Sequence, residues 1–258
     1  MRLVKKIEER GASETAGRVL QRVKSIYRWA VIHEKIASNP MIDLVHGEIL
    51  EPTTVTHRAA LPERELPEFL AKLAAYAGDP STSHGLHLLM LTAARPGEIQ
   101  GARWAEIDLE AALWTIPKER MKMRTEHAIP LSKQAVAVLR SMQPISGHRE
   151  LVFPSPVYPT KPISENTLNS AMIRMGYKSH ATAHGFRSLF STVANEKSGF
   201  HADVIERQLA HQERNKVRAA YNRTTYLAER TKLVQWWADY LDGRKSGNVV
   251  AVKFNRAA

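Results

Sequence analysis

The chain has 258 residues, of which 43% are hydrophobic and 24% are charged, a composition that excludes disordered and fibrous classes. Its 37 Lys and Arg against 26 Asp and Glu give a formal net charge of +11. This balance is expected of a protein that binds a polyanion, although a merely basic globular protein shares it. The absence of cysteine excludes disulfide frameworks, Cys-based zinc sites and thiol nucleophiles.

The sequence indicates neither a transmembrane segment nor a secretion signal. No apolar run approaches the ~18 residues that a membrane-crossing helix needs. The N-terminus, Met1 to Glu8, lacks the apolar stretch of a signal peptide. We therefore expect the chain to stay in the cytoplasm and to have no membrane partner.

The first part of the chain is predicted to be a small helical unit. Thr15 to Glu34 has apolar residues at three- and four-residue spacing, and Ser13 is the expected cap of this helix. Residues 51–62 have the composition of a linker. We place the domain boundary near residue 58, which leaves residues 1–57 as a partial helical domain with its linker and residues 58–258 as the larger domain.

The larger part is predicted to be mostly helical. Helical patterns occupy residues 63–77, 84–92, 132–142 and, with breaks at Gly176, Gly199 and Asn222, Ser164 almost to the C-terminus.

Three short β-like segments interrupt these helices. Ala112–Ile116 and His127–Leu131 are separated by residues 118–126, a polar and basic connection typical of a hairpin loop. Leu151–Pro154 is expected to be a short strand or extended piece. The predicted fold class is therefore mainly α with a small antiparallel β-sheet.

Six side chains of the larger part have the chemistry of phosphate binding and nucleophilic attack. They are Arg95, Lys122, His184, Arg187, His211 and Tyr221. Such cations can neutralise a pentacoordinate phosphate, and a phenol can act as a covalent nucleophile without a metal. No paired carboxylates and no metal-ligand cluster accompany them, so we predict neither a cofactor nor a metal.

The first two of these residues occupy a helix end and a loop. Arg95 precedes Pro96, and a residue before proline is pushed away from helical geometry, so its side chain is expected to project from a rigid corner. Glu98 is expected to hold that guanidinium in a fixed pose. Lys122 lies in the hairpin loop, where its ammonium can reach a leaving oxygen. Taken singly, each has an ordinary explanation, as a helix-end arginine and a solvated lysine.

The other four residues lie in the helical C-terminal half. His184 and Arg187 begin a helix and, three residues apart, share a face on which their donors can converge on one phosphate. His211 follows an amphipathic helix, and Tyr221 has small neighbours that permit close approach. Singly, a helix-end histidine and a half-buried tyrosine are the commoner readings. The joint occurrence of the six residues in this order favours a functional site.

In these motifs the chain resembles the tyrosine recombinases, or phage-type integrases, and specifically the branch of long prophage integrases that insert mobile elements near tRNA genes. The resemblance covers about Leu61 to Asp242. It rests on Leu91–Glu98 with Arg103-Trp104, Met121-Lys122 with Ile129–Leu131, Ala183–Arg187, Leu209–His211 and Ala219–Arg223.

The resemblance implies a role for each candidate residue. Arg95 and Arg187 would clamp the scissile phosphate, and His211 would also bind it. Lys122 would be the general acid for the 5′ hydroxyl, His184 a proton acceptor or donor near the nucleophile, and Glu98 a supporting residue. Tyr221 would attack DNA and give a 3′-phosphotyrosine. Tyr226 is a rival nucleophile, which a continuous helix would rotate roughly 140° away from Tyr221.

The resemblance also implies the partners and the domains. Residues 58–258 would be the catalytic domain, and residues 1–57 the last helices of a core-binding DNA domain. The partners would be double-stranded DNA attachment sites and, in the full-length protein, further copies of the chain in a tetramer on DNA. The reaction would integrate or excise a prophage or genomic island.

Other readings stay open from the residues alone. A type IB topoisomerase-like enzyme uses nearly the same residues to relax supercoils, and a catalytically silent DNA-binding fragment needs none of them. An RNase-like hydrolase is weaker still, since neither paired carboxylates nor a metal-ligand cluster is present. The helix predicted at Tyr226–Leu241, ending at Gly243, can pack in cis or on a neighbouring protomer. The strand-like run Val249–Phe254 can join a sheet edge in cis or in trans.

We predict that this chain alone binds attachment-site DNA weakly and with a strong salt dependence. Relatives of this branch carry an arm-site domain and a complete core-binding domain, and clamping around the duplex is expected to need both. The remaining contacts to phosphates release counterions, so the affinity should fall steeply as salt rises. A mobility-shift titration measures this, and tight site-specific binding at physiological salt contradicts it.

Overall fold

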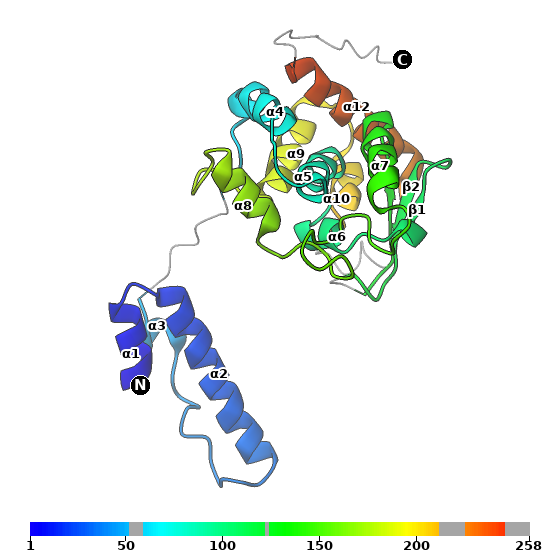
Figure 1. Ribbon diagram of the computed structural model, residues 1–258. Coiled ribbons are helices and arrows are strands. Elements are labelled where there is room, and N and C mark those ends of the chain that lie inside the picture. The colour runs from blue at the N-terminus through cyan, green and yellow to red at the C-terminus, as the bar shows by residue number, and fades with distance from the viewer. Residues whose placement is uncertain (52–58, 122–123, 212–224, 246–258) are drawn as a thin grey trace. The chain divides into compact units, whose positions relative to one another are not determined.

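The computed structural model describes residues 1–51, 59–121, 124–211 and 225–245 (Figure 1). The chain divides into two compact units, Met1–His57 and Arg58–Ala258. The predicted site residues Lys122 and Tyr221 lie outside the described residues, as do the predicted break at Asn222 and the run Val249–Phe254. No helix in the described part of the chain is both long enough and apolar enough to span a membrane.

The first unit is a helical hairpin with a small core. Its helices are α1 (Arg2–Glu9), α2 (Ser13–Ile32) and α3 (His46–Ile49). The buried side chains of its core are Val4, Ile7, Ala16, Leu20 and Leu50. The prediction that Ser13 caps the long helix is wrong: Ala12 holds the cap position without a side-chain hydrogen bond. Gly11, with φ of 78°, turns the chain so tightly that Ser13 already belongs to the helix.

The second unit packs its helices around one central helix, α5 (Pro80–Thr92). The surrounding helices are α4 (Leu66–Ala74), α6 (Pro96–Gln100), α7 (Lys133–Ser146), α8 (Thr167–Arg174), α9 (Gly185–Lys197), α10 (Ala202–Gln208) and α12 (Leu227–Lys245), with the short turns η1 (Glu63–Glu65) and η2 (Trp104–Glu106). Helix α5 contacts α6, α7, α8, α9 and α12, and it lies among them in Figure 1. Its apolar residues from Leu86 to Leu91 are at most 2% exposed, as a helix surrounded on all sides requires.

A three-stranded antiparallel sheet flanks these helices in the order β1 (Ile107–Asp108), β2 (Leu113–Ile116), β3 (His127–Pro130). Trp114 pairs with Ile129, and both are fully buried. The two longer strands and the predicted fold class, mainly α with a small antiparallel sheet, are confirmed. The strand β1 has only two residues, too few for an alternating pattern to reveal it in the sequence.

The helix boundaries follow local hydrogen bonds that the hydrophobic pattern alone does not show. Helix α5 begins at Pro80, four residues before the predicted start, because Asp79 caps it by accepting from the Ser81 N–H at 2.9 Å. Helix α12 continues through Gly243 to Lys245, which corrects the predicted end. Near this end the guanidinium of Arg244 donates to Glu63 at 2.7 Å, an ion pair that fastens the last turn to η1.

Helix α12 is fastened to the end of α5 by an indole hydrogen bond. Trp237 is 1% exposed, and its Nε1 donates to the Met90 carbonyl at 2.7 Å. Met90 lies in the last turn of α5, where carbonyls have no donor within their own helix. The bond therefore satisfies a buried acceptor directly upstream of the chain segment that carries Arg95.

We expect Trp237→Phe to lower the free energy of unfolding by about 1–3 kcal/mol, because the Met90 carbonyl loses its donor while most of the ring packing remains. Denaturant unfolding followed by far-ultraviolet circular dichroism measures the change. Trp236→Phe on the same helix is the matched control and should lose less, since the Trp236 ring is only partly buried. Equal losses in the two variants would contradict the role of this hydrogen bond.

Candidate active site

The first arginine of the site is presented by a sharp turn after α5. Ala93 follows the helix with φ of 52°, a left-handed conformation that is uncommon for a residue other than glycine. Arg95 is then extended, with ψ of 145°, as its place before Pro96 requires. The carboxylate of Glu98 accepts from the Arg95 guanidinium at 2.8 Å and from its backbone N–H at 2.7 Å. Glu98 is thus placed to fix both the main chain and the side chain of Arg95.

The second arginine enters the site from α9. Arg187 is 5% exposed, and its guanidinium donates to the carbonyls of Ala93 at 2.5 Å and Leu209 at 2.6 Å. Burial and then the charge of Arg95 lower the pKa of Arg187 to about 10, so it stays protonated at neutral pH. Two cations from distant parts of the sequence therefore share one buried region.

The end of α10 receives donors at three consecutive carbonyls. The Leu209 carbonyl accepts from Arg187, and the Ala210 carbonyl accepts from Arg95 at 3.1 Å. The carbonyl of Gln208 lies 3.3 Å from the Nε2 atom of His127, a residue of β3. A helix C-terminus carries partial negative charge, which favours cations at this place. Ala210 itself has φ of 50°, a second left-handed alanine at the site.

His211 completes the group of predicted residues that the structure brings together. Its Nε2 lies 3.3 Å from the Arg187 guanidinium, and its Nδ1 lies 2.7 Å from a carboxylate oxygen of Glu206. Because a guanidinium can only donate, Nε2 accepts, and the proton of a neutral ring is then on Nδ1 and donated to Glu206. About half exposed, the ring lies between the buried arginine and solvent.

His184 is the residue directly before α9, and it is half-buried. Gly185 follows it because the backbone of Ala59 passes so close that a Cβ atom would lie 2.3 Å from its carbonyl oxygen. Lys122 and Tyr221 lie outside the described residues. The chain leading to Lys122 is held by Arg120, which donates to the Glu98 carbonyl at 2.9 Å and to Glu106. The structure thus gathers Arg95, Glu98, Arg187 and His211.

Three residues beside the site were not predicted from the sequence. They are His127, Gln208 and Arg230. Gln208 donates to the Thr92 carbonyl at 2.9 Å and accepts from Arg230 Nε at 3.0 Å. A signal for Arg230 was present, because it lies in register with Leu233, Val234 and Trp237 on the apolar face of its helix. A charged residue at such a core position is uncommon and points to a specific buried partner.

Within the described ranges, no group of three or more His, Cys, Asp or Glu side chains is arranged to hold a metal ion.

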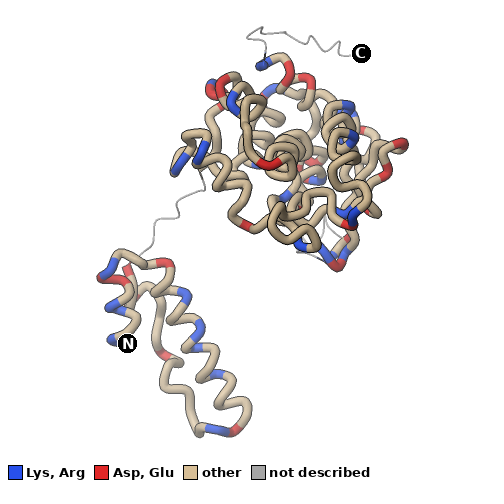
Figure 2. The backbone as a smooth tube through the Cα atoms, viewed as in Figure 1, with Lys and Arg blue, Asp and Glu red and all other residues tan. Residues whose placement is uncertain are grey.

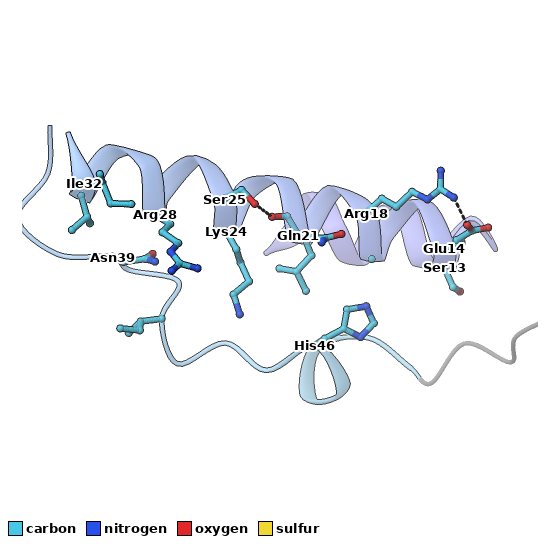
Figure 3. A pocket seen from close by; sticks show the side chains of 14 residues that line it. Ser13, Glu14, Arg18, Gln21, Lys24, Ser25, Arg28, Ile32, Asn39 and His46 are labelled. Atoms are coloured by element: carbon cyan, nitrogen blue, oxygen red, sulfur yellow. Dashed lines mark hydrogen bonds and ion pairs between the residues drawn. The ribbon is translucent and has the colours of Figure 1, made fainter. Parts of the chain in front are cut away.

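The first unit has a separate groove of about 1190 Å³ along α2. Figure 3 shows Arg28 pointing from α2 toward Asn39, and Arg18 turned toward Glu14. Lys24 points toward the returning chain and donates to the Leu44 carbonyl at 2.6 Å. Basic residues recur along this helix (Figure 2). The groove thus combines apolar lining with positive charge.

The chain belongs to the phage integrase family. The model of that family matches residues 60–227, and the model of the phage integrase central domain matches residues 1–46. The integrase of Enterobacteria phage P4 is 44% identical over 254 residues, covering 93% of this chain and 57% of that protein. The prophage integrase IntA of Escherichia coli is 37% identical over 256 residues, covering 99% of this chain and 61% of that protein. The chain thus spans about three fifths of the length of these relatives.

Solved structures of similar fold include lambda integrase. A dimer of its residues 75–356 bound to a COC′ core site superposes with a TM-score of 0.62 at 18% identity, covering 82% of this chain and 77% of that one. A lambda integrase tetramer bound to a Holliday junction has a TM-score of 0.63 at 18% identity, covering 83% and 63% of the two chains. At this identity the likeness shows a common fold.

The buried His127 predicts how stability depends on pH. Burial first, then the charges of Arg230, Arg95 and Arg187, lower the pKa of His127 to about 3, against 6.5 for an ordinary histidine. Below pH 6.5, His127 therefore becomes protonated in the unfolded chain but stays neutral in the folded chain. The free energy of unfolding falls as the pH drops from about 6.5 toward 3.

We expect a loss of at most about 1.4 kcal/mol per pH unit from this one group, and we expect His127→Gln to remove that part of the slope. Denaturant unfolding at several pH values measures it. His87, whose pKa burial lowers to about 4, stays in both proteins and contributes its own slope. An unchanged slope in His127→Gln would contradict the prediction.

Proposed function

We propose that the second unit is the catalytic domain of a site-specific DNA recombinase that cuts and rejoins DNA through a 3′-phosphotyrosine intermediate. The supporting observation is that Arg95 and Arg187 bond adjacent carbonyls at the end of α10, with His211 beside them. Two preorganised guanidiniums, of which that of Arg187 is buried, suit the charge that develops on a phosphodiester in its transition state. The similarity to integrases favours strand exchange over relaxation of supercoils alone.

In the proposed reaction, the phenolic oxygen of Tyr221 attacks phosphorus and the bond to the 5′ oxygen breaks. Lys122 supplies the proton that the leaving 5′ oxygen needs, and His184 receives or returns the proton of the phenol. Because the phosphotyrosine ester keeps the energy of the broken bond, the 5′ hydroxyl of another strand can reverse the step without ATP. Exchange of strands between two sites then integrates or excises a prophage or genomic island.

The partners we propose are double-stranded attachment sites and, in the full-length protein, further copies of the chain. Support comes from the solved lambda integrases of similar fold, which are a dimer on a core site and a tetramer on a Holliday junction. We assign residues 1–57 to part of a core-binding domain, supported by the match of the central-domain model and by the basic groove along α2. DNA as substrate suggests action in the cytoplasm.

The choice of nucleophile rests on the sequence context of Tyr221. Tyr226, the rival, is described: it lies directly before α12 with φ of 50°, and its ring packs against the main core. A left-handed residue interrupts a helix, so α12 does not extend back through Tyr226. A ring that packs on the core is poorly placed to attack DNA, which supports Tyr221.

A nicked duplex that traps the covalent intermediate tests the proposal. The duplex carries the junction sequence that flanks the genetic element encoding this chain. We expect the wild type and Tyr226→Phe to form a covalent protein–DNA adduct and Tyr221→Phe to form none, because only the last loses the attacking oxygen. Denaturing gel electrophoresis of labelled DNA measures the adduct.

Loss of the adduct in Tyr226→Phe alone would reassign the nucleophile. DNA binding without any adduct from the wild type would make this chain a catalytically silent binding fragment. Exchange between two differently marked duplexes distinguishes a recombinase from a type IB topoisomerase-like enzyme, which relaxes supercoils without exchanging partners.

A further inference from the structure

Arg230 is a buried cation that bonds three neutral acceptors. It lies on α12 and is 3% exposed. Its guanidinium donates to the side-chain oxygen of Gln208 at 3.0 Å, to the Thr225 carbonyl at 3.4 Å and to the Ala128 carbonyl at 2.6 Å. Burial lowers its pKa to about 10, so the side chain is still charged at neutral pH.

Two half-buried arginines of this chain, by contrast, are paired with carboxylates. Arg244, on the same helix, pairs with Glu63 at 2.7 Å, and Arg120 pairs with Glu106. Among the described residues, no carboxylate lies within ion-pair distance of Arg230. An uncompensated buried charge destabilises a fold, and an apolar side chain of similar volume would fill the same space at lower cost. The presence of an arginine at position 230 is thus better explained by the three segments that its hydrogen bonds connect than by a gain in stability.

The three acceptors lie on the segments that bracket the undescribed parts of the site. Gln208 lies four residues before residues 212–224, and Thr225 directly follows them. One guanidinium therefore bonds to the described chain on both sides of the segment that carries Tyr221. Ala128 belongs to β3, the strand that follows the loop of Lys122. A planar fork with several fixed donors suits such a junction better than a single ammonium does.

Gln208 extends the connection to the phosphate-binding arginines. Its side-chain nitrogen donates to the Thr92 carbonyl at 2.9 Å. The next residue, Ala93, accepts from Arg187, and Arg95 follows two residues later. Arg230 is therefore connected to the arginine pair through the side chain of Gln208 and the backbone from Thr92 to Arg95.

We propose that Arg230 is a positioning residue for the reaction. With Gln208 it fixes the described chain on both sides of segment 212–224, and the strand after the Lys122 loop, against the arginine pair. Nucleophile and general acid are thereby positioned to meet the same phosphate. The proposal rests on the proposed function for its effect on catalysis. The anchoring of the segment ends is testable without DNA.

The variants separate anchoring from general stability. Arg230→Met removes the fork, and Arg230→Lys keeps the charge but offers one ammonium for three acceptors. Arg244→Met is the matched control, because it removes a half-buried arginine and its bond to Glu63 from the same helix. Thermal melting of all three measures the loss of stability, which we expect in both methionine variants.

The catalytic readout is the single-turnover rate of adduct formation on saturating nicked duplex, measured together with the dissociation constant. For Arg230→Met we expect a rate about 100-fold lower with a dissociation constant within about threefold of wild type, because displacement by about 1 Å has such an effect. Arg230→Lys should lose about tenfold or more, and Arg244→Met should keep its rate within about threefold. Equal losses in Arg230→Met and Arg244→Met, or a full rate in Arg230→Lys, would overturn the proposal.

A double-mutant cycle tests whether Arg230 and Gln208 act together. Gln208→Met should slow adduct formation as Arg230→Met does, and the double variant should be little slower than either, because residues of one network are not additive. Additive losses would overturn the proposed connection. If Arg230→Met does not fold, Arg230→Lys and Gln208→Met decide by the same readouts.

Amide hydrogen exchange without DNA keeps this inference separate from the proposed function. We expect faster exchange in Arg230→Met, but not in Arg244→Met, for peptides that cover Leu209–His211 and Thr225–Leu227. Unchanged exchange at both ends would overturn the anchoring role. A wild type that forms no adduct would instead refute the proposed recombinase activity, and the exchange data would still decide whether Arg230 holds the segment.

Discussion

The site depends on the need of buried guanidiniums for acceptors. Arg187 donates to the backbone carbonyls of Ala93 and Leu209, at the ends of α5 and α10. Arg95 donates to the Ala210 carbonyl and to the buried carboxylate of Glu98. Those carbonyls lack donors within their own helices, so arginines and helix ends satisfy each other. These hydrogen bonds hold the last turns of the two helices together. Ala93 and Ala210 adopt left-handed conformations that turn the chain, so that their carbonyls face the arginines.

This arrangement leaves the site rich in positive charge. The pKa of His127, a residue of β3, is lowered by burial and by the positive charges of three neighbouring arginines, as expected at such a site. Glu98 pairs with Arg95, but the remaining positive charge opposes folding, and a phosphate bound between the arginines would relieve the repulsion. Stability given up at a functional site in this way is common in enzymes.

Much of the fold was predictable because local periodicity and capping determine it. The apolar spacing of α5, the cap that Ser132 gives to α7 and the alternation in β2 and β3 each need only neighbouring residues. The six candidate site residues could also be named from the sequence, because their residue types and order resemble those of a family to which the comparisons then assigned the chain. The sequence also placed Arg95 at a rigid corner, because Pro96 restricts the residue before it.

The sequence by itself thus determined the fold class, the family and the candidate residues, since each depends on residue identity and short-range spacing. Only the tertiary structure decided that Arg187 reaches Ala93 and Leu209, and that Arg230 joins α12 to β3 and α10. These contacts link residues far apart in the chain, and their partners are mostly backbone carbonyls, which every residue possesses. An acceptor common to all residues leaves no mark in the sequence, so its partner is identified only once the chain has folded.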